Sequence, residues 1–303
     1  MGRIIIGMSK IVLVSGFFDI GRDSFASHPR TTEQYFAWFK RWARMHNDLI
    51  VFCENAEVQQ RIVSALKRVK KHGSYQVINL GPKESYCSAV FSRMKQIEVS
   101  PAFKAFRISK SNCEDQASYC YVMFLKYYLL NVAMQYVDKA NSSDKYLAWI
   151  DFGFEHGGEL YGRSSQYNFE WQFPFFDRIV MSLVAPLDER PISTIAADTR
   201  NYCVAGALVV VPFQKVELFV SWVNDSYDEL LAQNIIDDDQ TILLDVYRKH
   251  SVDISLVPSR FFLALNQFGG RPRPKSARID SFVQGFKGLC VKLCPFIRRV
   301  HRK

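Results

Sequence analysis

Apolar residues in the first 80 positions form short continuous runs that alternate with stretches of helical spacing. Runs rich in β-branched residues at 11–15, 49–53 and 75–80 predict buried strands. Between these runs, the apolar side chains of 31–45 and 57–71 recur at helical intervals, which predicts two amphipathic helices. This order of strands and helices predicts a parallel sheet connected by crossover helices.

The rest of the chain continues the α/β pattern with longer elements. Helices are predicted at 119–137, 213–233 and 242–248, and strands at 146–150, 179–184 and 204–211. The stretch 155–175 is rich in Gly, Tyr and Phe, which predicts a long loop or a small hairpin. We therefore expect one α/β domain over residues 1–270, followed by a tail at 271–303.

Composition and charge set the tail apart from the body. Of the 303 residues, 48% are hydrophobic and 23% are charged, which is close to the average for globular proteins and argues against disorder. Ten of the 39 lysines and arginines lie in 271–303 but only one of the 30 acids, so the tail carries the whole net charge of +9. A nucleic-acid binder usually spreads its basic residues over a folded face, so we expect no nucleic-acid partner.

The cysteines and the N-terminus indicate a reduced compartment. No secretory signal precedes the cysteines, and their spacing is not typical of a zinc site: 53, 87, 113, 120, 203, 290 and 294. No apolar run reaches the roughly 18 residues that span a bilayer. We therefore expect free thiols in a cytoplasmic protein.

Polar residues follow two of the predicted strands, where open α/β sheets bind ligands. Asp19 and Arg22 come after the first strand and offer an acceptor for a base or ribose and a cation for phosphates. The alternative is an ordinary turn with a surface ion pair. Asp151 ends the strand at 146–150, where a carboxylate can hold a metal, a hydroxyl or a charged partner, or can cap the next turn.

Three further positions are candidates for chemistry. His156, with Glu155, is a possible second metal ligand or general base, although a plain surface histidine is the alternative. Asp239 and Gln240 precede an apolar helix and are expected to face inward, whereas the helix dipole alone accounts for the preceding acids. Lys126 lies within a strongly apolar helix, so we expect it to extend to solvent or to pair with a phosphate or an inward carboxylate.

Three segments resemble the HtrL/YibB family of bacterial proteins, which tend to be associated with lipopolysaccharide and other surface-polysaccharide loci. These segments are 11–22 (IVLVSGFFDIGR), 35–42 (YFAWFKRW) and 149–153 (WIDFG), and the resemblance extends over about residues 10–265. The family looks like glycosyltransferases of the GT-A type. The resemblance therefore implies a Rossmann-related, mostly parallel sheet flanked by helices, which binds a nucleotide-sugar donor.

The resemblance also implies a role for Asp151. This residue matches the first carboxylate of an Asp-x-Asp motif, which holds a divalent metal and the donor diphosphate. Gly153 stands where the second carboxylate is expected. A bound Mn²⁺ or Mg²⁺ would then need His156 or Glu155 as a further ligand.

The remaining candidates also resemble positions of GT-A glycosyltransferases. Asp19 and Arg22 match the nucleotide-facing loop, and Lys126 resembles a basic residue that reaches the phosphates. Asp239 and Gln240 resemble an acidic–Gln pair beside the acceptor, with Asp239 as proton acceptor if the reaction inverts configuration. The resemblance thus implies sugar transfer to a hydroxyl of a lipopolysaccharide, capsule or O-antigen glycan. The alternative is a non-catalytic scaffold that binds nucleotide-sugar or glycan, which Gly153 favours.

The tail is consistent with a lipid-linked acceptor. From Ile279 onward its apolar residues fall at helical spacing, with Lys287, Lys292, Arg298 and Arg299 between them. Such a basic amphipathic helix binds anionic lipid in the plane of the interface. We expect peripheral attachment to the cytoplasmic face of the inner membrane, and the alternative is a helix docked on the body.

Overall fold

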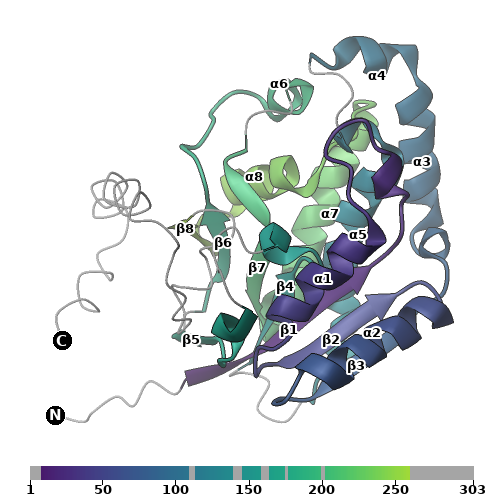
Figure 1. Cartoon of the computed structure of the whole chain (residues 1–303). Helices are drawn as coiled ribbons and strands as arrows, with labels where there is room; N and C mark the ends of the chain where they lie inside the picture. The colour runs from purple at the N-terminus through teal and green to yellow at the C-terminus, as the bar shows by residue number, and fades with distance from the viewer. Residues whose placement is uncertain are drawn as a thin grey trace, which may run out of the picture.

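A mixed sheet forms the centre of the computed structural model, which describes residues 8–108, 113–138, 145–157, 164–174, 177–198 and 202–259. The strand order is β3-β2-β1-β4-β7-β6-β8, and β5 pairs with the start of β1 (Figure 1). The strands are β1 (Met8–Phe17), β2 (Asp48–Cys53), β3 (Tyr75–Asn79), β4 (Lys145–Ile150), β5 (Gln172–Pro174), β6 (Ile179–Leu183), β7 (Val204–Pro212) and β8 (Ile254–Pro258).

Most neighbouring strands run parallel. β1 is parallel to β2 and β4, β2 is parallel to β3, and β6 is parallel to β8. β7 runs antiparallel to both β4 and β6. The predicted fold class, a mostly parallel α/β sheet flanked by helices, is confirmed. Because β7 is antiparallel, its amino end lies at the same edge of the sheet as the carboxyl ends of β1 and β4.

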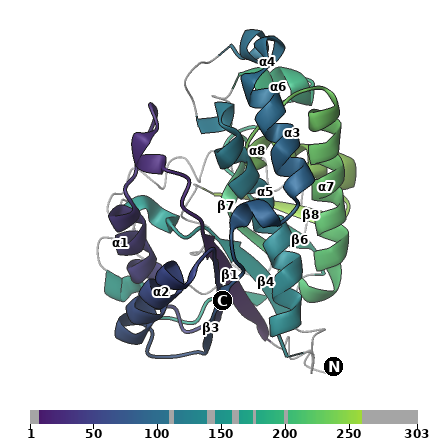
Figure 2. The same ribbon diagram turned by 90° about the vertical axis from the view of Figure 1, so that its right-hand side faces the viewer.

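Helices cover both faces of the sheet (Figure 2). They are α1 (Thr32–Trp42), α2 (Ala56–Val69), α3 (Ser88–Val99), α4 (Pro101–Phe106), α5 (Ala117–Ala133), α6 (Ile192–Ala197), α7 (Val216–Ala232) and α8 (Asp239–His250). β1 shows why both faces are covered, because its apolar side chains alternate between two buried clusters. Ile11 and Leu13 pack with α1 and α2, whereas Val12 and Val14 pack with α5 on the other face.

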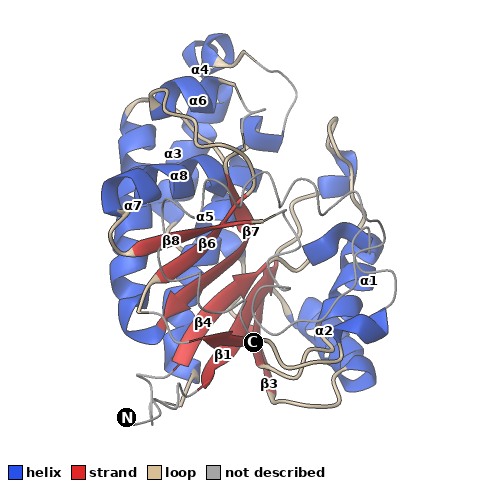
Figure 3. Cartoon of the chain, turned by 90° about the vertical axis from the view of Figure 1, so that its left-hand side faces the viewer, coloured by secondary structure: helices blue, strands red, loops and turns tan. Residues whose placement is uncertain are grey.

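Some elements differ from the sequence predictions. Helices α3, α4 and α6 and strand β8 were not predicted. Strand β8 extends the sheet beside β6 (Figure 3). The short 3-10 helices η6 (Phe154–Gly157) and η7 (Ser164–Tyr167) lie in or overlap the stretch 155–175, and its strand β5 pairs with β1, so the described part of the stretch forms no hairpin of its own.

The tail at 271–303 lies outside the described residues, so the expected domain division and basic helix stay predictions. The described cysteines, which do not include Cys290 and Cys294, are free thiols. None of the helices within the described ranges is both long and apolar enough to cross a bilayer.

Candidate functional site

A pocket of about 390 Å³ opens at the carboxyl ends of β1 and β4 and the amino end of β7. The sheet builds this site because parallel β1 and β4 deliver their following loops to one edge. Antiparallel β7 adds its first residues there, and the Asp151 N–H donates to Ala207 O at 3.0 Å. The candidate residues that line this pocket are Asp19, Arg22, Lys126, Asp151, His156, Asp239 and Gln240. The structure thus brings these seven predicted residues together in one pocket.

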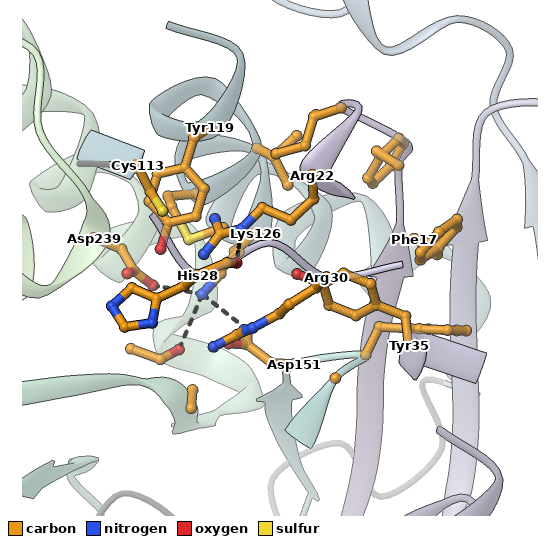
Figure 4. Close-up of a pocket in the computed structure, with 18 of the residues that line it drawn as sticks. Phe17, Arg22, His28, Arg30, Tyr35, Cys113, Tyr119, Lys126, Asp151 and Asp239 are labelled. Carbon is orange, nitrogen blue, oxygen red and sulfur yellow. Dashed lines mark hydrogen bonds and ion pairs between the residues drawn. The ribbon is translucent and has the colours of Figure 1, made fainter. Parts of the chain in front are cut away.

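Lys126 lies at the centre of the pocket floor and joins two of the candidate carboxylates (Figure 4). Its Nζ is 2.8 Å from Asp151 Oδ1, 2.8 Å from Asp239 Oδ2 and 3.4 Å from Gly206 O. Burial opposes the charge of the lysine, but the two carboxylates outweigh it and raise the pKa of Lys126 above its usual range. The prediction that Lys126 pairs with an inward carboxylate is therefore confirmed, and protein acceptors occupy all three of its donors.

Asp239 is the buried member of the carboxylate pair, with 3% of its side chain exposed. Its Oδ2 also accepts a hydrogen bond from the Tyr127 hydroxyl at 3.0 Å. Burial raises the pKa of Asp239, and the charge of Lys126 opposes that rise. The carboxylate packs directly on Gly206, where an added Cβ would lie 2.0 Å from Oδ2. Only a glycine at 206 leaves room for Asp239 in this position.

Asp151 is the more accessible carboxylate, with 33% of its side chain exposed. Its Oδ1 accepts a hydrogen bond from Trp149 Nε1 at 2.8 Å in addition to its ion pair with Lys126. A carboxylate that is fixed on one side and open on the other can hydrogen-bond a hydroxyl of a ligand.

Gln240 presents an acceptor without a partner. Its Nε2 donates to Asp238 Oδ2 at 2.9 Å, which fixes the orientation of the amide. Its Oε1 is buried and has no hydrogen-bond partner among the described residues. Asp238 is the N-cap of α8 and accepts from the Gln240 N–H, as expected for an acid with a structural role. Asp237 is ion-paired with Arg107 at 3.2 Å.

The loop between β1 and α1 forms one wall of the pocket and closes on itself. The Arg30 N–H donates to Arg22 O at 3.2 Å, and Arg22 Nε donates to His28 O at 3.3 Å. The guanidinium of Arg22 lies 4.8 Å from the ring centroid of Tyr119, and the whole residue is 7% exposed. In Figure 4 the side chains of Arg22 and Arg30 both point toward Lys126.

Asp19 sits at the rim of the pocket in a conventional turn. Its Oδ1 accepts the Gly21 N–H at 2.9 Å, and its own N–H donates to Glu54 Oε1 at 2.8 Å. Lys83 bonds to both Asp19 O and Glu54 Oε2, at 2.8 and 3.0 Å. The residue is exposed, so its carboxylate remains accessible to a ligand.

The described side chains around Asp151 form no set of ligands for a divalent metal. His156 Nδ1 is 3.5 Å from Arg30 Nη2, and burial together with Arg30 lowers the pKa of His156 to about 4. A Cβ at Gly153 would lie 2.8 Å from ring carbons of Tyr35, so the second carboxylate of an Asp-x-Asp pair has no room. The side chain of Glu155 lies outside the described part of the structure. Within that part, no group of three His, Cys, Asp or Glu side chains could hold a metal ion.

Several pocket residues escaped the sequence prediction. Arg30, Tyr35, Glu114 and Tyr119 line the pocket but do not directly follow a predicted strand. Of these residues, Arg30 had the clearest signal in the sequence. It lies immediately before Thr31, the expected cap of the helix after the first strand. The other three are brought in by α1, by the segment before α5 and by α5 itself.

Residues 9–269 match the family described as "Bacterial protein of unknown function (HtrL_YibB)". Protein HtrL of Escherichia coli (strain K12) is 26% identical over 258 residues, which cover 80% of this chain and 85% of that protein. Mouse xyloside xylosyltransferase 1 in its apo form matches 82% of the chain and 85% of its own, with 10% identity and a TM-score of 0.40. The glycosyltransferase GlyE of Streptococcus pneumoniae TIGR4 matches the same share of the chain but 45% of its own, with 10% identity and a TM-score of 0.38.

Proposed function

The chain belongs to the HtrL_YibB family, and from that premise we propose that it is a glycosyltransferase. It moves a sugar from a nucleotide-sugar donor to a hydroxyl of a lipopolysaccharide, capsule or O-antigen glycan. The observation that carries the proposal is the convergence of seven polar residues, from separate segments of the chain, on one pocket at the ligand-binding edge of the sheet. These residues supply cations, carboxylates and an amide, which are the groups that bind phosphates and hydroxyls.

The donor occupies the side of the pocket formed by the loop after β1. Arg22 holds its phosphates, and Asp19 accepts hydrogen bonds from the ribose or the base. Lys126, whose donors are engaged, fixes the carboxylates of Asp151 and Asp239 and contributes positive charge beneath the diphosphate.

The acceptor side is formed by the carboxylates and Gln240. In the reaction, the bond between the anomeric carbon and the diphosphate breaks, and the diphosphate leaves with the electron pair. The acceptor oxygen bonds to the anomeric carbon, and in an inverting reaction Asp239 takes the hydroxyl proton, because a raised pKa makes it a stronger base. The unpaired Gln240 Oε1 and the open side of Asp151 orient the sugar hydroxyls.

The proposal is tested by donor binding and donor hydrolysis. Purified protein is screened by thermal shift against sugar nucleotides, with and without Mn²⁺ or Mg²⁺. A donor at 100 times its Kd should stabilise the fold by about 2.7 kcal/mol. The stabilising donor is then assayed for slow release of nucleoside diphosphate, which we expect to fall at least about tenfold in Asp151→Asn.

The matched control is Asp225→Asn, which alters an exposed carboxylate of α7 outside the pocket. Release that is equal in the wild type and Asp151→Asn contradicts the role of Asp151. Binding without any release favours the scaffold alternative. The absence of any shift with sugar nucleotides contradicts the proposed donor class.

A further inference from the structure

Arg22 is a buried cation that forms no ion pair among the described residues. The buried carboxylate of Glu114 lies in the same pocket and interacts with Arg22 only through space. Arg22 is 7% exposed, and the one hydrogen bond of its side chain to the described protein is from Nε to the His28 carbonyl. Its guanidinium lies 4.8 Å from the Tyr119 ring centroid and 5.1 Å from that of Phe25, but no carboxylate of the described residues is within ion-pair distance. A buried charge without an ion pair is costly, so an ion that enters the pocket would relieve that cost.

Arg30 is held beside Arg22 by the backbone of the same loop. The Arg30 N–H bonds to Arg22 O at 3.2 Å, and both side chains line the pocket (Figure 4). Arg30 contacts the Trp38 ring at 5.6 Å and His156 Nδ1 at 3.5 Å, and it too has no ion pair among the described residues. Two guanidiniums that form no ion pair with a described carboxylate therefore face one cavity from one loop.

We propose that Arg22 and Arg30 together bind the diphosphate of the donor, and that transfer proceeds without a divalent metal. This inference rests on the proposed function. A sugar nucleoside diphosphate carries two negative charges, which the two guanidiniums match. Guanidiniums also bind phosphate through paired hydrogen bonds of fixed geometry, so they position the diphosphate as well as neutralise it.

Contacts of Lys126, Gly153 and His156 leave no place for a metal ion at the carboxylates of Asp151 and Asp239. The Lys126 ammonium already bridges Asp151 and Asp239 at 2.8 Å each, where a divalent ion would otherwise bind. Gly153 packs against Tyr35, so the position of the second carboxylate in an Asp-x-Asp motif cannot be filled without moving that ring. His156 faces Arg30, whose positive charge disfavours a metal ion at that histidine. The fixed cations thus take the place that a metal has in an Asp-x-Asp site.

The test is calorimetric titration of the full chain with UDP, GDP and inorganic pyrophosphate in excess EDTA. We expect binding in EDTA and a loss of affinity of about ten- to a hundredfold in Arg22→Gln and in Arg30→Gln, as for hydrogen bonds to charged groups. Arg22→Lys should restore only part of the affinity, because it keeps the charge but not the paired donors. Arg68→Gln, which alters an exposed arginine of α2 outside the pocket, should bind like the wild type.

The melting temperature of each variant without ligand shows whether it folds. Because Arg22 and Arg30 form no ion pair in the described protein, their removal should leave the melting temperature unchanged or raise it. A lowered melting temperature together with lost binding would make the arginines structural and overturn the inference.

The remaining outcomes separate the inference from the proposed function. Binding that requires Mn²⁺ or Mg²⁺ overturns metal-free transfer but leaves a glycosyltransferase. If the protein binds nucleotide in EDTA and neither Gln variant weakens that binding, the role of the two arginines is overturned. The proposed function then still stands. If neither nucleotide nor pyrophosphate binds with or without metal, while the protein melts cooperatively, the donor class and the inference both fail.

Discussion

At the scale of single residues, the geometry of the pocket depends on two glycines. Gly206 allows the carboxylate of Asp239 to lie against the backbone of β7, and Gly153 allows Tyr35 to pack on the turn after β4. Neither position has room for a Cβ without movement of its neighbour, since the added atom would come within 2.0 and 2.8 Å of existing atoms. The departure from an Asp-x-Asp pattern at 153 thus has a steric cause.

The substitution Gly153→Asp tests whether Tyr35 leaves no room for a side chain at position 153. Although it restores the Asp-x-Asp pattern, the new side chain must displace the Tyr35 ring, so we expect a loss of about 1–3 kcal/mol in the free energy of unfolding. Denaturant unfolding measures that loss, and titration with Mn²⁺ measures metal binding. Gly153→Ala is the control for bulk without charge. A Gly153→Asp protein that is as stable as the wild type and binds Mn²⁺ would contradict the prediction.

His156 makes the stability of the protein depend on pH. Its folded-state pKa of about 4 lies below the usual 6.5, because the residue is buried and faces Arg30. Between these values the unfolded chain binds a proton that the folded protein does not. The stabilising contribution is therefore complete above about pH 6.5 and is lost as pH falls toward 4, by up to about 3 kcal/mol.

The measurement is the free energy of unfolding between about pH 4 and pH 7 for the wild type and His156→Gln. The variant should lose less stability on acidification, because its side chain takes up no proton on unfolding. Curves that run parallel over this range would show that His156 does not titrate as predicted.

At the scale of elements, the start of α1 sets the position of the arginine loop, which is the loop 18–31 between β1 and α1 that carries Arg22 and Arg30. Thr31 is the N-cap, its Oγ1 accepts the Gln34 N–H at 3.2 Å, and the Gln34 side chain accepts the Thr31 N–H at 2.8 Å. This reciprocal pair fixes the backbone immediately after Arg30. The cap therefore contributes to helix stability and to the placement of one guanidinium.

Thr31→Ala is expected to lower the free energy of unfolding by about 1 kcal/mol, the usual cost of a lost N-cap. It should also weaken nucleoside diphosphate binding, because the end of the arginine loop is released. The control is Asn55→Ala, which removes the cap of α2, where Asn55 Oδ1 accepts the Val58 N–H at 2.9 Å. A similar loss of stability without a change in affinity is expected there. Equal affinity in both variants would contradict a positioning role for the α1 cap.

Strong periodicity explains which elements were predictable. Strands β1 and β2 are buried on both faces and helix α2 is buried along one face, so their sequences carry a clear hydrophobic pattern. In α3 only Met94 and Ile97 are buried, and β8 is mostly half-buried, so the hydrophobic pattern is weak in both. β5 has three residues, too few to show any period. Tertiary contacts rather than local sequence determine these elements.

The candidate site was predictable where it follows from topology. Asp19, Arg22 and Asp151 lie just beyond strand ends, and parallel strands bring such positions together. The contact of Asp239 with Gly206 joins α8 to β7, and no local pattern in either segment signals it. Arg22 and Arg30 lie side by side because the Arg30 N–H donates a hydrogen bond to Arg22 O across an irregular loop. The spacing of the two residues in the sequence does not reveal this contact.

At the scale of the whole molecule, charge is divided between a neutral body and a cationic tail. Residues 1–270 contain 29 basic and 29 acidic residues, and 271–303 supply the net charge of +9. The body has no net charge that would attract it to an anionic surface, so we expect such attraction to come from the tail. If the proposed glycan acceptor is lipid-linked, attachment of the protein to the membrane would raise the local acceptor concentration.

Deletion of residues 272–303 is therefore expected to abolish binding to vesicles that contain anionic lipid while it leaves donor binding intact. Sedimentation with anionic vesicles measures the first and calorimetry the second. Each Lys or Arg near the surface contributes about 1 kcal/mol, so binding by the full chain should weaken strongly with salt and be slight on zwitterionic vesicles. A variant with Lys287, Lys292, Arg298 and Arg299 changed to Gln keeps the apolar stripe and should bind weakly. Unchanged vesicle binding after the deletion would place the membrane contact on the body, and the tail would then be a solvated end.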